Sequence, residues 1–278
     1  MLPSGSEGSP KPKPSLFWSQ GSMKQCVLVL VVVCGVCAGV AQNAHAQMGT
    51  WADRGYVNFS FGVESGSSSL SDTQNLTIYD EAGHITSSTT WTSGAMLDGG
   101  FGVRVWRNLT VGFSYHQEEN DTDGQLTGSI PSPLVFNSPR TLDQDVVLDR
   151  KEKALHLVVG WVFPFSEKFD LMVFGGPSFF RLEQDGVAPF QASDIREAGS
   201  PFTTVSVDEE KVTHKKSLTG FNVGVDGTYI LWSNDNLRIG AGGFVRFTQA
   251  SGDIQQLVTE QPTDVGGVQF GFGARLRF

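Results

Sequence analysis

Every second position at the C-terminus is apolar: Phe270, Phe272, Ala274, Leu276 and Phe278. The positions between them are small, polar or basic: Gln269, Gly271, Gly273, Arg275 and Arg277. Successive side chains of a β-strand point to opposite faces, so this alternation predicts a strand with one apolar face. A strand of a soluble sandwich would alternate in the same way. The two arginines and the terminal aromatic residue favour a membrane strand, with lipid on its apolar side and a barrel lumen on the other.

Seven earlier segments repeat this alternation: 55–64, 95–106, 109–117, 151–163, 169–183, 215–231 and 237–248. Short connections and long polar connections follow one another in strict rotation. An even number of strands of about ten residues, with long loops at one end, is typical of outer-membrane barrels. The sequence therefore predicts an all-β fold, an eight-stranded antiparallel transmembrane up-and-down β-barrel with long extracellular loops and short periplasmic turns. A soluble sandwich or lipocalin-like barrel is the alternative, but its apolar residues would point inward.

Two of the long connections carry patterns of their own. Residues 76–86 alternate around Ala82 and Gly83, which predicts a hairpin that continues the barrel wall above the membrane. Residues 118–150 contain several prolines and acids, so we expect a loop there. The acids of residues 118–123 could bind calcium through oxygen ligands, but their spacing is not that of an EF-hand. We expect this run to be solvated.

The N-terminal region predicts export. Lys24 precedes an apolar run over residues 26–40, and Ala44-His45-Ala46 follows as an A-x-A site. We therefore predict a signal peptide over 23–46, cleaved after Ala46, and interpret residues 1–22 as a mis-assigned start or an extension. A transmembrane anchor is the alternative, although the apolar run is short for one. Residues 47–54 would then form a short periplasmic segment before the barrel at 55–278, and the location would be a Gram-negative outer membrane.

Charge and cysteine usage narrow the function classes. The whole chain has 20 basic and 29 acidic residues, a formal net charge of −9. Residues 1–46 hold three lysines and one glutamate, so the mature chain has 17 basic and 28 acidic residues and a net charge of −11. No basic stripe remains for nucleic acid. All three cysteines lie in the predicted signal peptide, so cysteine offers the mature protein no disulfide, zinc site or thiol nucleophile. We predict no cofactor and no metal site.

Parity places ten acidic and basic side chains on the inner face, besides His116 and His156. They are Glu64, Asp98, Arg104, Glu152, Asp170, Asp226, Arg238, Arg246, Arg275 and Arg277. An eight-stranded barrel is only wide enough inside for side chains to fill, so charges buried there must pair. We predict a lumen salt-bridge network, with Asp170 meeting arginines near the periplasmic end and Arg246 meeting acids toward the outer end. A gated narrow pore is the alternative.

Four basic residues have the outward parity at the loop ends of neighbouring strands: Lys151, Lys153, Arg181 and Lys215. Charges that face lipid are tolerated only near an interface. Phosphate groups of lipopolysaccharide lie at that level of an outer membrane, so these residues are lipopolysaccharide-contact candidates. Ordinary solvation at the rim is the alternative.

The strand pattern over 55–278 and the closing residues 271–278 resemble the small eight-stranded outer-membrane barrels, similar to the OmpA transmembrane domain and OmpW-like proteins. The resemblance implies an assembly signal, read by the barrel-assembly machinery after delivery by periplasmic chaperones. Its residues would be Phe272, Ala274, Leu276 and Phe278. It also implies surrounding outer-membrane lipid and lipopolysaccharide, and we expect a monomer.

The favoured function is a structural surface protein that supports envelope integrity, with loops available for recognition or adhesion. A narrow channel, or an OmpW-like conduit for small apolar molecules, is the alternative, because glycines on the inner face of several strands could leave room. A lipid-modifying barrel enzyme is a third possibility. It would need a histidine cluster at the lipid-facing rim. His116 and Ser114 instead have the inward parity, so we predict no catalytic residue and no enzyme.

Overall fold

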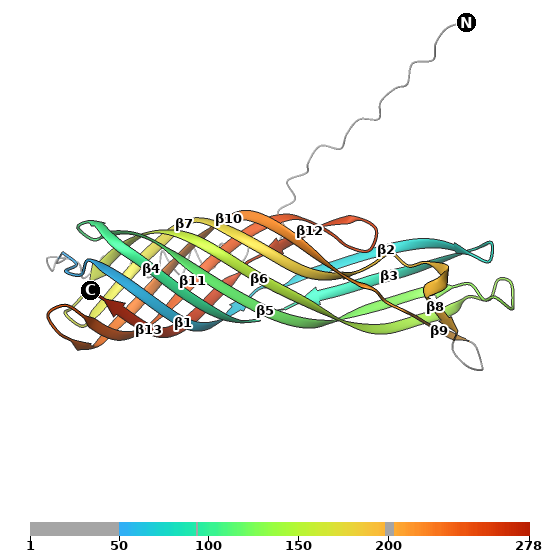
Figure 1. Cartoon of the computed structure of the whole chain (residues 1–278), viewed down its shortest axis with the longest axis horizontal. Helices are drawn as coiled ribbons and strands as arrows, with labels where there is room; N and C mark the ends of the chain where they lie inside the picture. Colours follow the sequence, from blue (N-terminus) through green and yellow to red (C-terminus); the bar gives the residue numbers. More distant parts are fainter. Residues whose placement is uncertain (1–49, 93, 198–202) are drawn as a thin grey trace, which may run out of the picture. The chain divides into compact units, whose positions relative to one another are not determined.

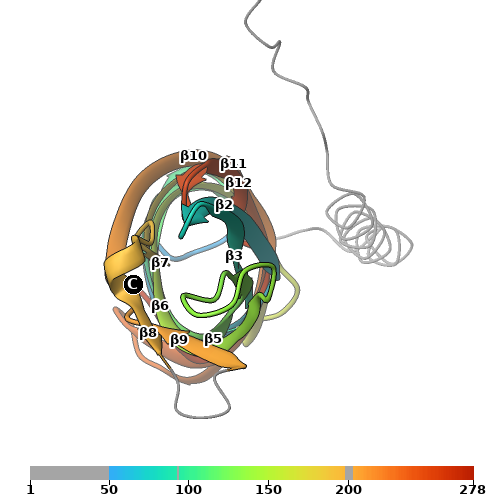
Figure 2. The same ribbon diagram turned by 90° about the vertical axis from the view of Figure 1, so that its right-hand side faces the viewer.

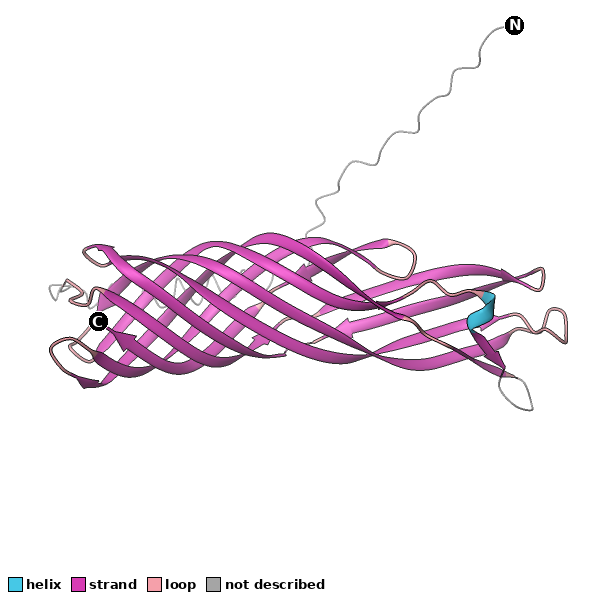
Figure 3. Cartoon of the chain, in the orientation of Figure 1, coloured by secondary structure: helices cyan, strands magenta, loops and turns pink. Residues whose placement is uncertain are grey.

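The structure, a computed structural model, describes residues 50–278 except 93 and 198–202. The predicted signal peptide lies outside these residues. The described part is built almost entirely of β-strands, with one short 3-10 turn, η1 (Ala192–Asp194) (Figure 3). Within this part of the chain, no helix is long and apolar enough to cross a membrane.

Eight of the described strands form a closed wall (Figures 1 and 2): β1 (Gly55–Ser65), β4 (Gly94–Trp106), β5 (Leu109–Ile130), β6 (Arg140–Pro164), β7 (Phe169–Val187), β10 (Lys211–Ser233), β11 (Arg238–Gln255) and β13 (Val268–Arg277). Each pairs antiparallel with the next. β1 pairs with β13, from Tyr56 opposite Arg277 to Ser65 opposite Val268, and this pairing closes the ring. Closure removes the unpaired strand edges that would otherwise need protection. The predicted eight-stranded antiparallel barrel is confirmed.

The wall exposes apolar side chains and buries polar ones along a continuous belt. Phe61 and Phe272 lie opposite each other on β1 and β13 and are 64% and 67% exposed. Asn58 and Ser60, on the other face of β1, are buried. Aromatic rings are exposed near the short turns: Trp106, Trp161, Phe165, Phe169, Tyr229, Trp232 and Phe278. Such amphipathic rings collect at membrane–water interfaces.

Much of the sequence expected as loops extends the wall instead. Residues 118–150 are mostly strand, since β5 runs to Ile130 and β6 begins at Arg140, so the expectation of a loop there was wrong. β2 (Ser68–Ile78) and β3 (Glu81–Trp91) form a hairpin whose second strand pairs with β5. β8 (Ile195–Glu197) pairs with β9 (Thr204–Val207), which also pairs with β6, and β12 (Glu260–Val265) pairs with β11. We call this part of the barrel the extended end.

The hydrophobic pattern changes face where the extended end begins. On the belt part of β5, Phe113 is exposed and Ser114 is buried. Further along β5, beyond Thr122, apolar residues take the inward positions, and Leu126 and Ile130 are fully buried. On β6 the inward Leu142, Val146 and Leu148 follow the same rule, and all five residues join one apolar cluster with Ile85 and Trp91 of β3. The strands therefore continue without a break from an apolar-outside belt into an apolar-inside, water-facing barrel.

The predicted hairpin is present, but its turn lies earlier than expected. Tyr79 and Asp80, not Ala82 and Gly83, take the left-handed conformation, with φ of 55° and 61°. Two successive positive φ values give the turn type that matches the twist of a two-residue hairpin. Gly83 serves a different purpose, because a Cβ there would lie 2.9 Å from the carbonyl oxygen of Ser129. The glycine allows β3 to approach β5 closely.

Candidate functional site

The lumen inside the apolar belt contains ion pairs stacked along its axis. Nearest the short turns, Arg277 Nη2 lies 3.3 Å from Asp170 Oδ1 and 3.8 Å from Asp226 Oδ1. One layer above, Arg275 Nη2 donates to Asp226 Oδ2 at 2.7 Å, and Arg275 Nη1 donates to Ser60 Oγ at 2.8 Å. All five residues are buried. A buried charge is tolerated when it is paired and hydrogen-bonded, as each of these is.

Arg246 occupies the third layer and connects four strands. Its Nη2 lies 2.7 Å from Asp98 Oδ2 of β4, and its Nη1 donates to Ser114 Oγ of β5 at 2.7 Å. Its Nε donates to Gln269 Oε1 of β13. Gln269 in turn donates to Glu64 Oε2 at 2.5 Å, so it stands between this arginine and an acid that we expected to pair with it directly. Gln269 was not among the predicted site residues, although it has the inward parity that could have identified it.

Two predicted members of the network lie in the mouth at the short-turn end. Arg104 donates to the backbone oxygen of Trp51, and Arg238 Nη1 lies 2.9 Å from Asp53 Oδ2. Trp51 is buried, and its backbone N–H donates to Asn108 Oδ1 at 2.9 Å. The segment before β1 therefore folds into the mouth and supplies acceptors to both arginines. Parity within the strands could not reveal this, because Trp51 and Asp53 precede the first strand.

Two histidines stack in the lumen between Arg246 and the extended end. The rings of His116 and His156 are 5.0 Å apart and nearly parallel. His116 Nδ1 lies 2.8 Å from His156 Nε2, and His156 Nδ1 lies 2.7 Å from Ser178 Oγ. Both rings are fully buried, with the ring of Phe180 edge-on against them. They belong to one hydrogen-bonded line across β5, β6 and β7.

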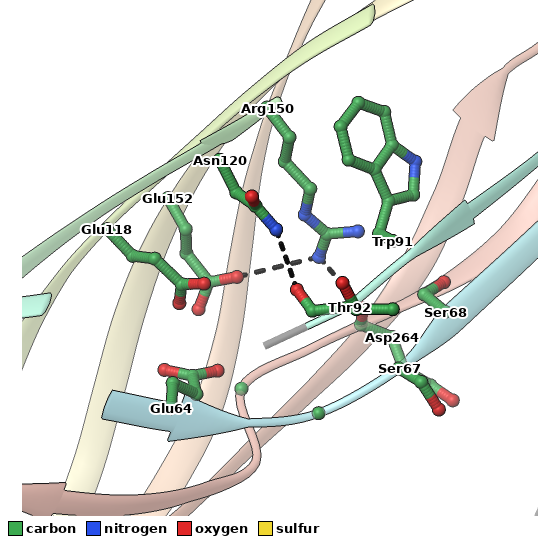
Figure 4. Close-up of a pocket in the computed structure, with 12 residues that line it drawn as sticks. Glu64, Ser67, Ser68, Trp91, Thr92, Glu118, Asn120, Arg150, Glu152 and Asp264 are labelled. Carbon is green, nitrogen blue, oxygen red and sulfur yellow. Dashed lines mark hydrogen bonds and ion pairs between the residues drawn. The ribbon is translucent and has the colours of Figure 1, made fainter. Parts of the chain in front are cut away.

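A cluster of acids lies at the level where the inward-facing residues change from polar to apolar (Figure 4). Glu64 of β1, Glu118 of β5 and Glu152 of β6 turn their carboxyl groups toward one another. His116 Nε2 lies 3.7 Å from Glu64 Oε2 and 3.9 Å from Glu152 Oε1. A cavity of about 50 Å³ lies beside them. Arg150 is the basic residue that lines this cavity, and its Nη2 is 3.5 Å from Glu152 Oε2.

The pKa values of two acids outside the belt are shifted in opposite directions. Burial, followed by the charge of Glu64, raises the pKa of Glu118 to about 8. Burial also opposes ionisation of Asp72 on β2, but hydrogen bonds from the backbone N–H groups of Val258 and Thr259, at 2.7 and 2.8 Å, outweigh it. The pKa of Asp72 is therefore lowered.

The four outward basic residues lie on adjacent strands. Lys153 of β6 is opposite Arg181 of β7, and Lys215 of β10 is opposite Glu183 of β7. Two acids that the sequence analysis did not include lie among them. Lys151 Nζ is 2.6 Å from Glu119 Oε1, while Glu183 Oε1 is 3.3 Å from Arg181 Nε and 3.7 Å from Lys215 Nζ. The surface is therefore a mixed one, with four cations and two carboxylates.

The acidic run at 118–123 does not form a calcium loop. It is part of β5, so its side chains alternate between the two faces of the wall. Glu118 faces the cavity, whereas Glu119, Asp121 and Asp123 are exposed. The four assembly-signal candidates also alternate out of the lumen, and Phe272 and Phe278 are exposed on the outer wall.

An apolar outer belt around a lumen of paired charges defines a transmembrane β-barrel protein. No protein-family model matches the chain, and no curated protein matches it.

Solved structures similar to this chain include three outer-membrane proteins. OprG from Pseudomonas aeruginosa is 13% identical, with 83% of this chain and 98% of that chain covered and a TM-score of 0.44. The attachment invasion locus protein Ail of Yersinia pestis is 11% identical, with coverages of 81% and 99% and a TM-score of 0.36. The protease OmpT of Escherichia coli is 10% identical, with coverages of 84% and 99% and a TM-score of 0.39. Similarity at this level assigns no activity to the chain.

Proposed function

We propose that this chain is a non-conducting outer-membrane barrel that supports the cell envelope and presents its extended end for recognition. The filled lumen is the observation that carries this proposal. Arg246, Arg275 and Arg277 block it at three levels, and each is buried and paired. The cavity beside Arg246 and Asp226 measures about 30 Å³, and the one at the acid cluster about 50 Å³. A larger cavity of about 910 Å³ opens at the short-turn mouth, and none of the three arginines lines it. Cavities of 30 and 50 Å³ have room for a few water molecules but not for a solute such as a sugar.

The inner glycines support the same conclusion. They seemed to leave room for a conduit, but neighbouring side chains fill the space above them. A Cβ at Gly102 would lie 2.5 Å from the ring of Tyr56, and one at Gly271 would clash with the ring of Phe244. Close packing of this kind favours a structural barrel over a passage for small apolar molecules.

The outer-membrane location is supported by several features that agree with one another. The belt is apolar outside, and exposed aromatic rings surround its short-turn end. The predicted signal peptide supplies the export route, and the final strand supplies the expected assembly signal. Short turns would then face the periplasm, and the extended end would face the cell exterior.

The extended end provides the surface for recognition. Its wall has an apolar core of its own, so the connection at 131–139 is held on two paired strands instead of on a long loop. Leu134, Val135 and Phe136 in this connection are 73%, 58% and 72% exposed. Apolar side chains grouped at a protruding tip mark a contact surface. Nearer the belt, the basic residues around Arg181 would contact lipopolysaccharide phosphates.

The histidines give no support to a lipid-modifying enzyme. His116 and His156 are fully buried in the lumen, away from the lipid-facing rim where such chemistry would act.

Planar-bilayer recording tests the proposal. The mature protein, folded in detergent and reconstituted, should give no discrete conductance steps above leak, while a porin reconstituted in the same way reports successful insertion. Swelling of loaded liposomes by small neutral sugars should also be absent. Reproducible steps that depend on protein concentration would show that the ion pairs open and would contradict a filled lumen.

A further inference from the structure

The acid cluster brings three ligand groups from three strands to one point. Glu64 of β1, His116 of β5 and Glu152 of β6 each offer one ligand atom, and these atoms lie within 4.8 Å of one another. All three residues are buried. The cluster adjoins the Arg246 layer through Gln269, but it is not one of the three layers that fill the lumen, and the structural role proposed above does not require it.

The hydrogen-bond network fixes the tautomer of His116. Arg246 Nε–H can only donate, so Gln269 must receive this bond through Oε1 and present its amide hydrogens on the other side. These hydrogens face Glu64 Oε2 at 2.5 Å and His116 Nε2 at 3.4 Å. His116 Nε2 is therefore the unprotonated nitrogen, and its Nδ1–H donates to His156 Nε2 at 2.8 Å. The second histidine in turn donates through Nδ1 to a serine hydroxyl at 2.7 Å.

This tautomer places a nitrogen lone pair among carboxylate oxygens. Glu152 Oε1 has no hydrogen-bond partner among the described residues, although its side chain is only 5% exposed. An unpaired buried carboxylate oxygen is costly, and this one lies 3.9 Å from His116 Nε2, whose lone pair the Gln269 amide meets only at 3.4 Å. Three carboxyl groups meet here. Arg150 lies against Glu152, and Arg246, which already pairs with Asp98, reaches Glu64 only through Gln269. A further positive charge at the centre would satisfy these acceptors together.

We propose that Glu64, His116 and Glu152 bind one divalent transition-metal cation of the zinc type at the extended end of the lumen. Ligand atoms about 2.0–2.1 Å from a tetrahedral ion are about 3.3 Å apart. The two separations from His116 Nε2, 3.7 and 3.9 Å, need to shorten by a few tenths of an ångström, and the two carboxylate oxygens, which lie within 4.8 Å of each other, would turn toward the ion. A site with an imidazole nitrogen suits Zn²⁺ better than Ca²⁺, which takes oxygen ligands.

The surroundings suit such an ion. The hydrogen bond from His116 Nδ1 to His156 orients the ligand ring, which is the usual support of a metal-bound histidine. The cavity beside the acids is lined by Ser67, Ser68 and Asn120, which provide polar groups along a path to the site. A bound ion would link β1, β5 and β6 where the wall leaves the membrane.

Calorimetric titration of the folded mature protein with ZnCl₂ tests this proposal. After treatment with a chelator, the protein should bind one Zn²⁺ per chain, and Glu152→Gln should weaken binding by at least about tenfold by removing one ligand. Glu119→Gln is the matched control, since Glu119 lies on the neighbouring strand and is exposed on the outer face. It should bind as the unmodified protein does. Equimolar Ca²⁺ should not displace the ion.

Folding of each variant is verified by its heat-dependent mobility on gels, with Glu64→Gln as the replacement if Glu152→Gln does not fold. X-ray absorption of the Zn²⁺-loaded unmodified protein provides a measurement that needs no variant, and it should show one imidazole in a shell of light atoms. Each of four results would overturn the proposal. They are absence of saturable Zn²⁺ binding, a metal shell without imidazole, equal Zn²⁺ affinity of the ligand variant and the Glu119→Gln control, and full displacement of Zn²⁺ by Ca²⁺.

Discussion

Replacing Arg275 by methionine tests whether the lumen ion pairs stabilise the barrel. Methionine keeps a long, flexible apolar stem and removes only the charged head. Arg275 is 0% exposed, and its guanidinium donates to Asp226, to Ser60 and to the backbone oxygen of Ala274. The substitution removes all of these bonds at once.

The expected loss of stability follows from the buried carboxylate that the substitution leaves without its main partner. Asp226 stays buried, and its nearest remaining cation is Arg277 at 3.8 Å. Removing one partner of a buried pair costs about 3–5 kcal/mol, mostly from the charge left behind. We therefore expect Arg275→Met to lower the free energy of unfolding by about 3–5 kcal/mol. The double variant Arg275→Met/Asp226→Leu removes both charges, so it should be more stable than the single variant by at least about 2 kcal/mol.

Guanidinium unfolding from lipid vesicles, followed by tryptophan fluorescence, measures these differences. Heat-dependent mobility on gels confirms that each variant reaches the folded barrel first. Lys151→Met is the control, because Lys151 also pairs with an acid, Glu119, at 2.6 Å, but on the exposed outer wall. Solvent screens such a pair, so we expect no resolvable change in its unfolding midpoint.

Two results would refute this reasoning. An unfolding midpoint of Arg275→Met equal to that of the unmodified protein would show that the pair does not contribute to stability. Equal stability of the single and double variants would show that an uncompensated charge on Asp226 is not the cause of the loss. Either result would mean that the arginines fill the lumen by packing and that their ion pairs do not stabilise the barrel.

Three further predictions concern other parts of the wall. Because folding lowers the pKa of Asp72, its contribution to stability is complete above its unfolded pKa and is lost as pH falls through its folded pKa. Hydrogen-exchange protection of residues 258–259 should therefore fall when the unmodified protein is acidified. In Asp72→Asn, this protection should depend less on pH. Gly271→Leu should destabilise the barrel by about 1–3 kcal/mol because its side chain meets Phe244, whereas Gly227→Ala, with its nearest neighbours 3.8 Å or more away, should unfold at the unmodified midpoint. Charge reversal at the four outward basic residues should reduce stabilisation by lipopolysaccharide in vesicles and leave stability in plain phospholipid unchanged, whereas equal loss in both would indicate a structural role. The positions are Lys151, Lys153, Arg181 and Lys215.

The belt could be predicted from sequence because one rule governs it. Lipid outside and a packed lumen inside require strict alternation, so the exposed Phe61 and the buried Arg275 both follow from parity alone. Parity also places Asp98 and Arg246 on the same face. It cannot decide that these two pair with each other while Glu64 meets Gln269, since that depends on strand register and side-chain reach. The mouth residues Trp51 and Asp53 precede the first strand, so no strand rule applies to them.

Apart from the hairpin at 76–86, the extended end was missed because its pattern is the inverse of the belt. At Leu126 and Leu148 the apolar side chains occupy inward positions that hold polar residues lower in the same strands. A search for apolar residues on the outward parity therefore stops near Glu118 and Glu152, and the remainder looks like a polar loop. The prolines of 131–139 do mark a connection, but a much shorter one than expected.

This inversion also explains where the acid cluster lies. Below it, lipid covers the wall and the lumen must hold the polar side chains in pairs; above it, water covers the wall and the interior must be apolar. Glu64 and Glu152 occupy the boundary, where Gln269 separates Glu64 from Arg246 and where Glu152 Oε1 has no hydrogen-bond partner among the described residues. His116, which stacks on His156, lies at the same level, with its Nε2 3.7 Å from Glu64 Oε2. A polar site enclosed by three strands is therefore a consequence of continuing one barrel from lipid into water. A bound cation would balance the excess negative charge of its carboxyl groups.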